Sequence, residues 1–315
     1  MEQTVTHCPA CGSASVERSA VRDFPMGRCT KCHLRWLLDP PTGKDLADLY
    51  ESGFYAGAAR GGFVVRALHG VNNAIRLRVL DGIPVGRLLD IGSGKGRFLG
   101  AAKGAGWDVL GIEFAEGAAA TARSTFGVEV ITGDFIDTPV EGPFDAITIW
   151  HTLEHLPDPA AALSKVAGLL PPGGHVIVSV PNSASAQARW GGSVWFHLDL
   201  PRHLYHLTPA SLSALLERSG FSVMRIGHFY PEMEAIGLIQ TALNKAGLGQ
   251  DILYRFAKRD TTAVPGVRLM LSAILALTLV PVALVWSGIA PAFRTGASIQ
   301  VVARLKAPRV NTQSE

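Results

Sequence analysis

Four cysteines occupy the first 32 residues of the chain as two C-x2-C pairs, and no cysteine follows them. Each pair turns two sulfurs toward one centre, and two such pairs supply the four thiolates of a tetrahedral zinc site. Because four thiolates leave no open position on the metal, the pattern predicts a structural Zn²⁺ in a ribbon over residues 1–41. The alternative is four thiols without metal; the expected ligands are Cys8, Cys11, Cys29 and Cys32.

The predicted ribbon carries almost no net charge. Residues 1–41 hold five Lys or Arg and four Asp or Glu, whereas a nucleic-acid-binding module would carry a marked positive patch. A docking or scaffold role is therefore favoured. His7 and His33 adjoin the cysteine pairs as substitute ligands that the site does not need.

A glycine-rich turn follows an apolar run, in the sequence Asp90-Ile91-Gly92-Ser93-Gly94-Lys95-Gly96. Glycines let the backbone approach a ligand closely, and a helix that follows offers free N–H groups in its first turn. A phosphate-binding P-loop would need glycine in place of Leu89 and Ser or Thr in place of Gly96. A dinucleotide fingerprint would need Gly or Ala in place of Arg97. The pattern that remains is D-x-G-x-G-x-G.

Predicted strands and helices alternate from residue 87 onward, and they must position this turn. Strands are expected at 87–91, 108–113, 128–131, 144–150, 174–180, 221–229 and 298–305. Helices are expected between them, for example at 96–105 and 160–170. This alternation predicts the α/β class with a parallel, Rossmann-like sheet. A helical linker is expected at 42–82, interrupted at Gly61-Gly62, with apolar residues at helical spacing: Leu46, Leu49, Tyr50, Val71, Ile75 and Val79.

The glycine turn and the residues downstream of it resemble the motifs of class I S-adenosylmethionine-dependent methyltransferases. Glu113 ends the second strand, 23 residues after Asp90, and Gly133-Asp134-Phe135 follows the third strand. The exit of the fourth strand, with Leu153-Glu154-His155 and Asp158-Pro159, resembles a bacterial group that includes the ubiquinone-pathway O-methyltransferases. The resemblance covers residues 8–230 and 298–305, so it includes the ribbon.

This resemblance implies a seven-stranded methyltransferase sheet, built from residues 83–230 and 295–308, with a pocket for S-adenosylmethionine. It implies that Glu113 holds both ribose hydroxyls and that Asp90 orients the methionine ammonium. The Asp134 carboxylate would accept from the adenine amine, and the Phe135 backbone N–H would donate to the ring. The expected cofactor-binding residues are Asp90, Gly92, Ser93, Gly94, Gly96, Glu113, Asp134, Phe135 and Trp150.

The methyl acceptor is expected where the fourth and fifth strands end, facing His151, Glu154, His155 and the 182–206 loop. Methyl transfer from a sulfonium is an in-line displacement, so the protein mainly aligns the acceptor and removes its proton. A histidine near its ordinary pKa takes a hydroxyl proton at neutral pH, and His151 is the first candidate for this base. The alternative for Glu154 and His155 is structural, as a helix cap or a fixed point of the loop.

Residues 190–199 form an aromatic, glycine-containing stretch that suits a lid over an apolar or ring-shaped acceptor. A dense polar cluster lies in and just after it. This cluster could bind a phosphate, a carboxylate or a metal, or it could lock the loop by hydrogen bonds; its members are His197, Asp199, Arg202, His203 and His206.

Two acceptor classes are disfavoured by what the sequence lacks. The fourth strand has no (D/N)-P-P-(Y/F) motif for exocyclic amines, and every cysteine lies in the ribbon, so none serves as a nucleophile for C5-pyrimidine methylation. Hydroxyl or carbon acceptors on small or lipid-linked molecules remain. The alternative is an RNA methyltransferase that docks through its ribbon, although the net charge of +3 makes nucleic acid the less favoured partner. A non-catalytic protein that keeps the fold as a scaffold is disfavoured by the intact glycine turn.

An apolar insertion is predicted at 231–294. Residues 269–293 contain no charge, are flanked by Arg268 and Arg294, and are long enough to cross a bilayer. A single crossing would leave the last strand on the wrong side, and Pro281 could divide the segment into two arms. We therefore expect a re-entrant or interfacial helical hairpin, held at anionic lipid by its basic flanks. The alternative is a helical pair packed on the catalytic domain or in a dimer interface.

The expected location follows from these features. The sequence begins with a cysteine motif and shows no apolar signal segment at its N-terminus. We expect a cytoplasmic protein that is peripheral or re-entrant at the inner face of the membrane.

Overall fold

Seven strands form the central sheet in the order β10-β11-β8-β7-β4-β5-β6. The computed structural model describes residues 6–42, 63–257 and 266–307. Strands β4 to β8 pair in parallel, and the last strand, β11, runs antiparallel between β8 and β10. The predicted fold class, an α/β Rossmann-like methyltransferase sheet, is confirmed. The strands are β4 (Arg87–Ile91), β5 (Asp108–Glu113), β6 (Glu129–Thr132), β7 (Ala146–Trp150), β8 (His175–Pro181), β10 (Phe221–Gly227) and β11 (Ser298–Leu305).

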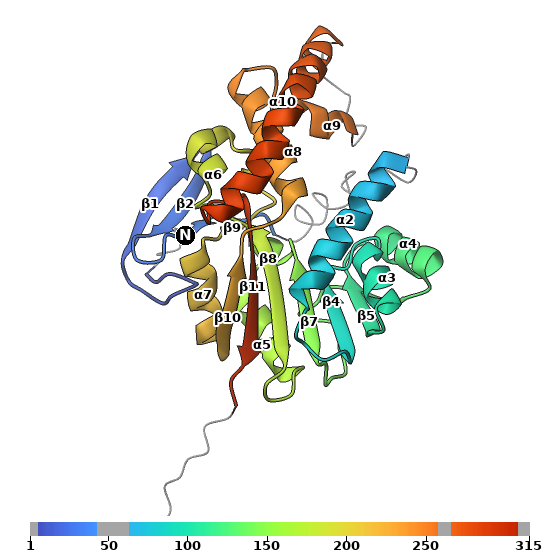
Figure 1. Ribbon diagram of the computed structural model, residues 1–315. Coiled ribbons are helices and arrows are strands. Elements are labelled where there is room, and N and C mark those ends of the chain that lie inside the picture. Colours follow the sequence, from blue (N-terminus) through green and yellow to red (C-terminus); the bar gives the residue numbers. More distant parts are fainter. Residues whose placement is uncertain (1–5, 43–62, 258–265, 308–315) are drawn as a thin grey trace, which may run out of the picture.

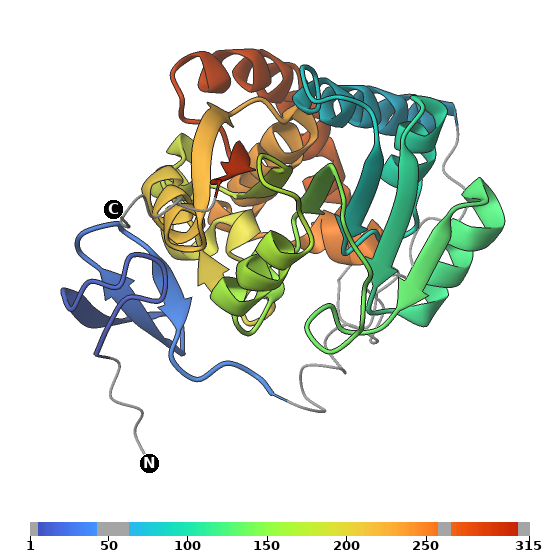
Figure 2. The ribbon, with the colours of Figure 1, turned by 90° about the horizontal axis from the view of Figure 1, so that it is seen from below.

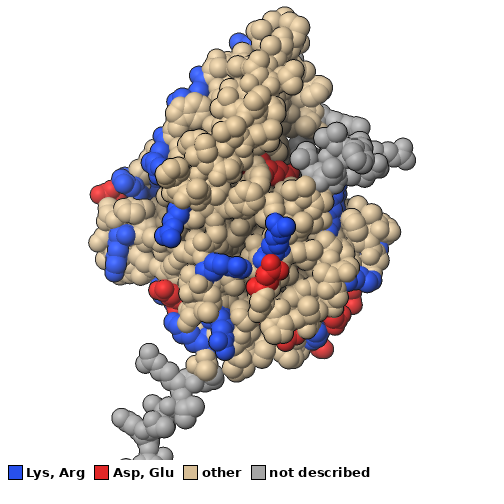
Figure 3. Space-filling view, in the orientation of Figure 1, with Lys and Arg blue, Asp and Glu red and all other residues tan. Residues whose placement is uncertain are grey.

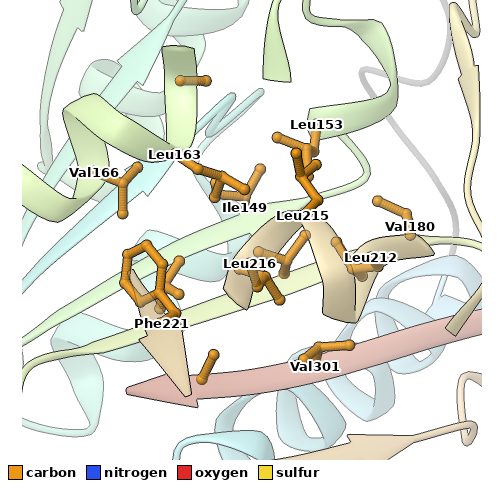
Figure 4. Close-up of a cluster of buried hydrophobic side chains, with 14 of the residues drawn as sticks. Ile149, Leu153, Leu163, Val166, Val180, Leu212, Leu215, Leu216, Phe221 and Val301 are labelled. Atoms are coloured by element: carbon orange, nitrogen blue, oxygen red, sulfur yellow. The ribbon is translucent and has the colours of Figure 1, made fainter. Parts of the chain in front are cut away.

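Helices cover both faces of this sheet (Figures 1 and 2). One face packs against α2 (Phe63–Val79), α3 (Arg97–Gly104) and α4 (Glu116–Phe126). The other packs against α5 (Pro159–Gly168) and α7 (Pro209–Arg218), with leucines of α7 and Phe221 filling the core against Ile149 and Val301 (Figure 4). Of the linker expected at 42–82, α2 is described; Leu46, Leu49, Tyr50 and Gly61-Gly62 lie outside the described residues.

Local capping fixes where the helices on the second face begin. Asp158 Oδ1 accepts hydrogen bonds from Ala160 N and Ala161 N, and a proline at the first helical position starts α5. Thr208 and Ser211 form a reciprocal capping box at the start of α7. These caps fix the start of α5, which follows β7, and the start of α7, which follows the 182–206 loop.

The N-terminal ribbon is joined to the catalytic domain through a shared sheet. Its strands β1 (Val16–Val21), β2 (Phe24–Cys29) and β3 (Arg35–Leu37) continue into β9 (Tyr205–His206), which comes from the loop after β8. Thr208 Oγ1 donates to Cys32 O at 2.9 Å, and Arg218 donates to Pro9 O and Ala10 O. The ribbon is thus an integral part of the domain.

Between β10 and β11, the described residues form a lobe of three helices: α8 (Pro231–Lys245), α9 (Ile252–Ala257) and α10 (Gly266–Ala292). Pro281 does not divide the apolar segment into two arms, because α10 continues through it. A proline inside a helix removes one backbone hydrogen bond, but the helical conformation is kept on both sides of Pro281. The antiparallel partner of α10 is α8 (Figure 1). The hairpin is therefore formed by two separate helices, and not by two arms of the 269–293 segment as expected.

Candidate active site

The glycine turn at the end of β4 has a backbone that only glycine adopts without strain. Gly92, Gly94 and Gly96 have φ angles of 72°, 55° and 72°. A Cβ on Gly92 would lie 2.2 Å from Thr152 Oγ1, and one on Gly96 would lie 2.5 Å from the Ala122 Cβ. The left-handed backbone and the close contacts with Thr152 and Ala122 therefore both require glycine in this turn.

Glu113, the expected ribose ligand, holds this turn in place. It is 3% exposed at the end of β5, and its Oε2 accepts a hydrogen bond from Gly94 N at 2.8 Å. Its Oε1 accepts from Ala115 N at 2.9 Å. The carboxylate therefore lies beside the turn where the predicted cofactor would bind.

Asp90 lies under the turn and is paired across the sheet with Thr148. Its Oδ1 accepts a hydrogen bond from Thr148 Oγ1 at 2.6 Å, in register between β4 and β7. Burial raises the pKa of Asp90 to about 7, although Thr148 and the positive charge of Arg76 act in the opposite direction. A bound ammonium group would favour the charged form. Thr148 was not predicted from the sequence. A hydroxyl-bearing residue within an otherwise apolar strand could have indicated it as a hydrogen-bond partner.

The segment expected to contact adenine follows β6. Asp134 is half-buried and accepts a hydrogen bond from Ile136 N at 2.7 Å. Phe135 is 4% exposed, and Lys165 of α5 lies 4.9 Å from its ring centroid. The Lys165 ammonium also donates to the carbonyls of Phe135, Ile136 and Thr138. This lysine, which sequence reasoning did not select, anchors the segment to α5.

The polar atoms left over in this region fit a polar cofactor. Ser93 Oγ and Trp150 Nε1 are buried and make no hydrogen bond within the described residues. A buried polar group without a partner is costly, so such atoms favour a ligand. The Trp150 ring packs edge-on against Phe98 at 5.3 Å between centroids, beside the start of α3. The residues present therefore fit S-adenosylmethionine.

Arg76 and Tyr230 join the cofactor side of the site to the acceptor side. The Arg76 guanidinium lies 5.1 Å from the Trp150 ring centroid and donates from Nε to Tyr230 Oη at 2.9 Å. Tyr230 in turn packs edge-on against His151, with 5.5 Å between centroids. Arg76 comes from the linker helix and Tyr230 from the start of the lobe, so neither was expected here.

His151 lies at the exit of β7 and contacts three other segments. Its φ is 51°, and its backbone N donates to Ser179 O at 2.8 Å. Nε2 lies 3.3 Å from both Ser179 Oγ and Ser298 Oγ. Nδ1 lies 3.5 Å from Glu154 Oε1, at ion-pair distance. The side chain is 17% exposed, so it keeps limited access to solvent.

Glu154 is a buried carboxylate among three histidines, on the short turn Leu153–His155. Burial raises its pKa, but His151, His155 and His203 together outweigh burial and bring the pKa below its ordinary value. The group is therefore ionised at neutral pH. A carboxylate fixed in this way can orient the His151 ring and stabilise its protonated form.

His155 belongs to a second group with His203. The ring centroids are 4.6 Å apart, and Nδ1 of each ring lies close to a backbone oxygen, Arg202 O for His155 and His197 O for His203. One ligand atom from each of Glu154, His155 and His203 lies within 4.8 Å of the others. This donor set suits a divalent transition metal, or a locked loop. Burial lowers the pKa of His155 to about 4, which disfavours it as the base.

The rest of the predicted polar cluster locks the 196–206 loop. Arg202 forms an ion pair with Asp199 at 2.6 Å, and His197 Nε2 lies 2.9 Å from Met233 O. Burial lowers the pKa of His197 to about 4 and lowers that of His206 well below its ordinary value. These rings are neutral at physiological pH, which suits a structural role.

The four cysteine sulfurs converge in the ribbon. Cys8 and Cys32 sulfurs are 3.5 Å apart, those of Cys11 and Cys29 are 3.6 Å apart, and all four lie within 4.8 Å of one another. Four sulfurs at about 2.3 Å from a tetrahedral zinc would be separated by about 3.8 Å. Burial raises the pKa of Cys8 to about 11, so its thiolate needs a cation. The residues fit zinc.

Comparison with known proteins places this site in a family. The sequence profile of the methyltransferase domain family matches residues 65–226, just over half of the chain. The chain belongs to this family. The match begins in α2 and ends in β10, so this methyltransferase domain contains the glycine turn, Glu113 and the exit of β7.

Individual relatives point to the same bacterial group that the sequence motifs indicated. A ubiquinone biosynthesis O-methyltransferase of Alkalilimnicola ehrlichii is 38% identical over 128 residues, covering 37% of this chain and 51% of the relative. One from Thiobacillus denitrificans is 32% identical over 171 residues, covering 49% of this chain and 73% of the relative. The chain thus spans about half the length of the first of these relatives. The expected family is confirmed.

Solved structures share the fold at low sequence identity. A chain in the complex of the Haloferax volcanii Trm112 methyltransferase activator with a methyltransferase has a TM-score of 0.51 and 16% identity, covering 78% of this chain and 93% of that one. The cyclase SpnF has a TM-score of 0.50 and 19% identity, covering 85% and 98%. At these identities, the likeness describes the fold alone.

Proposed function

We propose that this protein transfers a methyl group from S-adenosylmethionine to a hydroxyl or carbon of a small or lipid-linked acceptor. One observation carries the proposal: the His151–Glu154 pair lies at the end of β7, directly beside the strand whose glycine turn is held by Glu113. A proton acceptor and a nucleoside-binding turn at adjacent strand ends are the two parts that methyl transfer needs.

The cofactor side uses residues at the ends of three adjacent strands. S-adenosylmethionine, when bound, supplies a methyl group on a positively charged sulfur. Glu113 would exchange its contact with the turn for the ribose hydroxyls, and Asp90 would hold the ammonium group. Asp134 and Phe135 would read the adenine.

On the acceptor side, His151 is the proposed base. A hydroxyl of the acceptor would give its proton to Nε2 as its oxygen bonds to the methyl carbon and the carbon–sulfur bond breaks. Glu154 would hold Nδ1–H and stabilise the imidazolium that results. Ser179 and Ser298, both near Nε2, would orient the ring before the acceptor arrives.

A lipid-linked acceptor is supported by the names of the relatives and by the apolar lobe. Ubiquinone biosynthesis O-methyltransferases are named for a quinone pathway, and α10 adds an apolar surface to this chain. We propose a cytoplasmic protein whose 264–294 segment contacts the inner face of the membrane. The RNA alternative is disfavoured because the ribbon carries almost no net charge.

We propose a structural Zn²⁺ bound by Cys8, Cys11, Cys29 and Cys32. Its position next to β9 and α7 would make it a support of the 182–206 loop. A closed four-thiolate site would take no part in the chemistry.

Calorimetric titration with S-adenosylhomocysteine tests the cofactor assignment. The zinc-loaded wild-type protein is expected to bind, and Glu113→Gln is expected to bind at least tenfold more weakly. Asp108→Asn is the matched control, because this carboxylate lies at the opposite end of β5 and its side chain is 79% exposed. Absence of binding by the folded wild-type protein would overturn the proposal.

A further inference from the structure

Helix α10 turns its small residues toward the protein and its large apolar residues outward. Its buried positions are Ser272, Ala283, Ser287 and Ala290, at spacings that follow one face of a helix. Only 11% of the most apolar 18-residue stretch of this helix is buried. The large side chains on the opposite face are exposed: Val267, Met270, Leu271, Ile274, Leu277, Val280, Val282, Leu284, Val285 and Ile289.

This arrangement is the reverse of a surface helix in water. Such a helix buries its large apolar side chains and exposes polar ones. Small residues at a helix contact, with large aliphatic residues facing outward, are instead the pattern of helices that pack within lipid. Leu277 is 74% exposed and Leu284 is 62% exposed, and each would gain free energy by leaving water.

The serines of α10 satisfy their hydroxyls without an external partner. Ser287 Oγ donates to Ala283 O at 2.7 Å and lies 3.5 Å from Pro231 O of α8. Ser272 Oγ donates to Arg268 O at 2.7 Å. The hydroxyls of the buried face are thus satisfied, and within the described residues the outer face of α10 is exposed.

Positive charge borders this uncharged face. In Figure 3 the upper lobe has a broad surface without acidic or basic residues, with Lys and Arg along one side. Arg268 and Arg294 stand exposed at the two ends of the apolar segment. A bilayer containing anionic lipid offers apolar chains to the face and negative charge to its border.

Both ends of the lobe return to the same catalytic body. The chain enters α8 from β10 and leaves α10 into β11, which pairs with β10 and β8. A single crossing of the bilayer would separate β11 from its sheet. Any contact of the lobe with a bilayer must therefore leave both of its ends on the same side.

We infer that α10 is a monotopic membrane anchor, inserted by its outer face into one leaflet of an anionic bilayer, and that the lobe delivers a bilayer-resident acceptor to His151. The second clause rests on the proposed function. The lobe is joined directly to the site, since Ser287 Oγ lies 3.5 Å from Pro231 O, and the preceding residue, Tyr230, packs edge-on against His151. The acceptor class is an amphiphile whose hydroxyl lies at the lipid–water boundary.

Vesicle flotation of the full-length, zinc-loaded protein tests this inference. We expect the wild-type chain to float with vesicles of phosphatidylcholine and phosphatidylglycerol. Leu277→Gln combined with Leu284→Gln is expected to weaken partitioning roughly a hundredfold, because two apolar side chains no longer enter lipid. Arg268→Gln with Arg294→Gln is expected to reduce binding to the anionic vesicles and to leave binding to pure phosphatidylcholine unchanged.

The control keeps the number of apolar replacements and moves them away from α10. Val85→Gln with Met224→Gln changes side chains that are 59% and 60% exposed, and this variant should float like the wild type. S-adenosylhomocysteine binding by the Leu277/Leu284 variant should be unchanged, so loss of the anchor is distinguished from failure of the methyltransferase assignment. The inference is overturned if the wild-type chain does not float. It is equally overturned if the chain is a dimer that these leucine replacements dissociate, because a second copy then covers the face.

Discussion

His151 Nδ1 lies 3.5 Å from Glu154 Oε1, and the Glu154 side chain is only 1% exposed. Burial raises the pKa of Glu154, but the neighbouring histidines bring it below its ordinary value, so an ionised carboxylate faces Nδ1 of the ring. In the mechanism that we propose, the opposite nitrogen, Nε2, is the proton acceptor. This relationship underlies the first prediction.

Replacing His151 with Asn should slow methyl transfer by about 10²- to 10⁴-fold, the range typical of a lost general base. Asparagine tolerates the positive φ of this position, so the fold should remain. Activity is measured with labelled cofactor and a membrane extract as acceptor, and S-adenosylhomocysteine affinity should stay within a factor of a few. His175→Asn, at the far end of β8, is the control. Equal losses in both variants would contradict the assignment.

The stability of the ligand-free protein should depend on the ionisation of Asp90. Its pKa is raised from 3.8 to about 7 by burial, so the folded state binds more protons than the unfolded state between these values. The contribution of Asp90 to the free energy of unfolding is therefore greatest below about pH 4 and falls as the pH rises toward 7. Asp90→Asn should flatten this dependence in denaturant titrations, and an unchanged profile would argue against a raised pKa.

Cofactor binding should also release a proton in that pH range. A bound ammonium group favours the charged form of Asp90 and so lowers its pKa. Calorimetric titration with S-adenosylhomocysteine at pH 6.5, in buffers of different ionisation enthalpy, should report this release. Asp90→Asn should abolish the difference between buffers.

Removing zinc should destabilise α7 and β9 as well as the ribbon. Tyr205 pairs with Trp36 across the shared sheet, and Thr208 donates to Cys32 O, so loss of the metal reaches the catalytic domain. Hydrogen exchange after treatment with a chelator should increase at 205–218, and zinc should reverse the change. The Cys29→Ser variant should show faster exchange from the start and respond less to the chelator. An effect confined to residues 6–37 would show that the ribbon is independent.

Gly96→Ala and Gly127→Ala should differ in cost although both glycines have positive φ. The Gly127 site has no neighbouring atom within 4 Å of an added Cβ, so its replacement should cost about 1–2 kcal/mol for the backbone alone. At Gly96 the Ala122 Cβ lies 2.5 Å away, and overpacking should add about 1–3 kcal/mol. Chemical denaturation measures both values. Equal costs would mean that α4 moves freely away from the turn.

Much of the sheet could be predicted because each strand has a local signature. The strands at 87–91, 108–113 and 298–305 were expected with the bounds that the structure has. Short apolar runs carry this information within a few positions, and the first two of these runs end at Gly92 and Glu113. The cofactor turn was recognisable for the same reason.

The acceptor side could be predicted only in part, because its contacts join distant parts of the chain. Arg76 meets Tyr230 across 154 positions, and Glu154 meets His203 through a loop that also completes the ribbon sheet. Neither pair leaves a periodic pattern in the sequence. Continuity of α10 through Pro281 was missed for a related reason, since the support comes from packing on α8.

The position of β11 has a consequence for biogenesis. Among the strands of the described residues it is synthesised last, yet it lies inside the sheet between β8 and β10 and brings Ser298 to His151. Until the ribosome has passed the helical lobe, β8 and β10 lack their common neighbour and the acceptor side lacks one of its walls. Because β11 follows α10 in the sequence, α10 leaves the ribosome before the acceptor side of the site is complete.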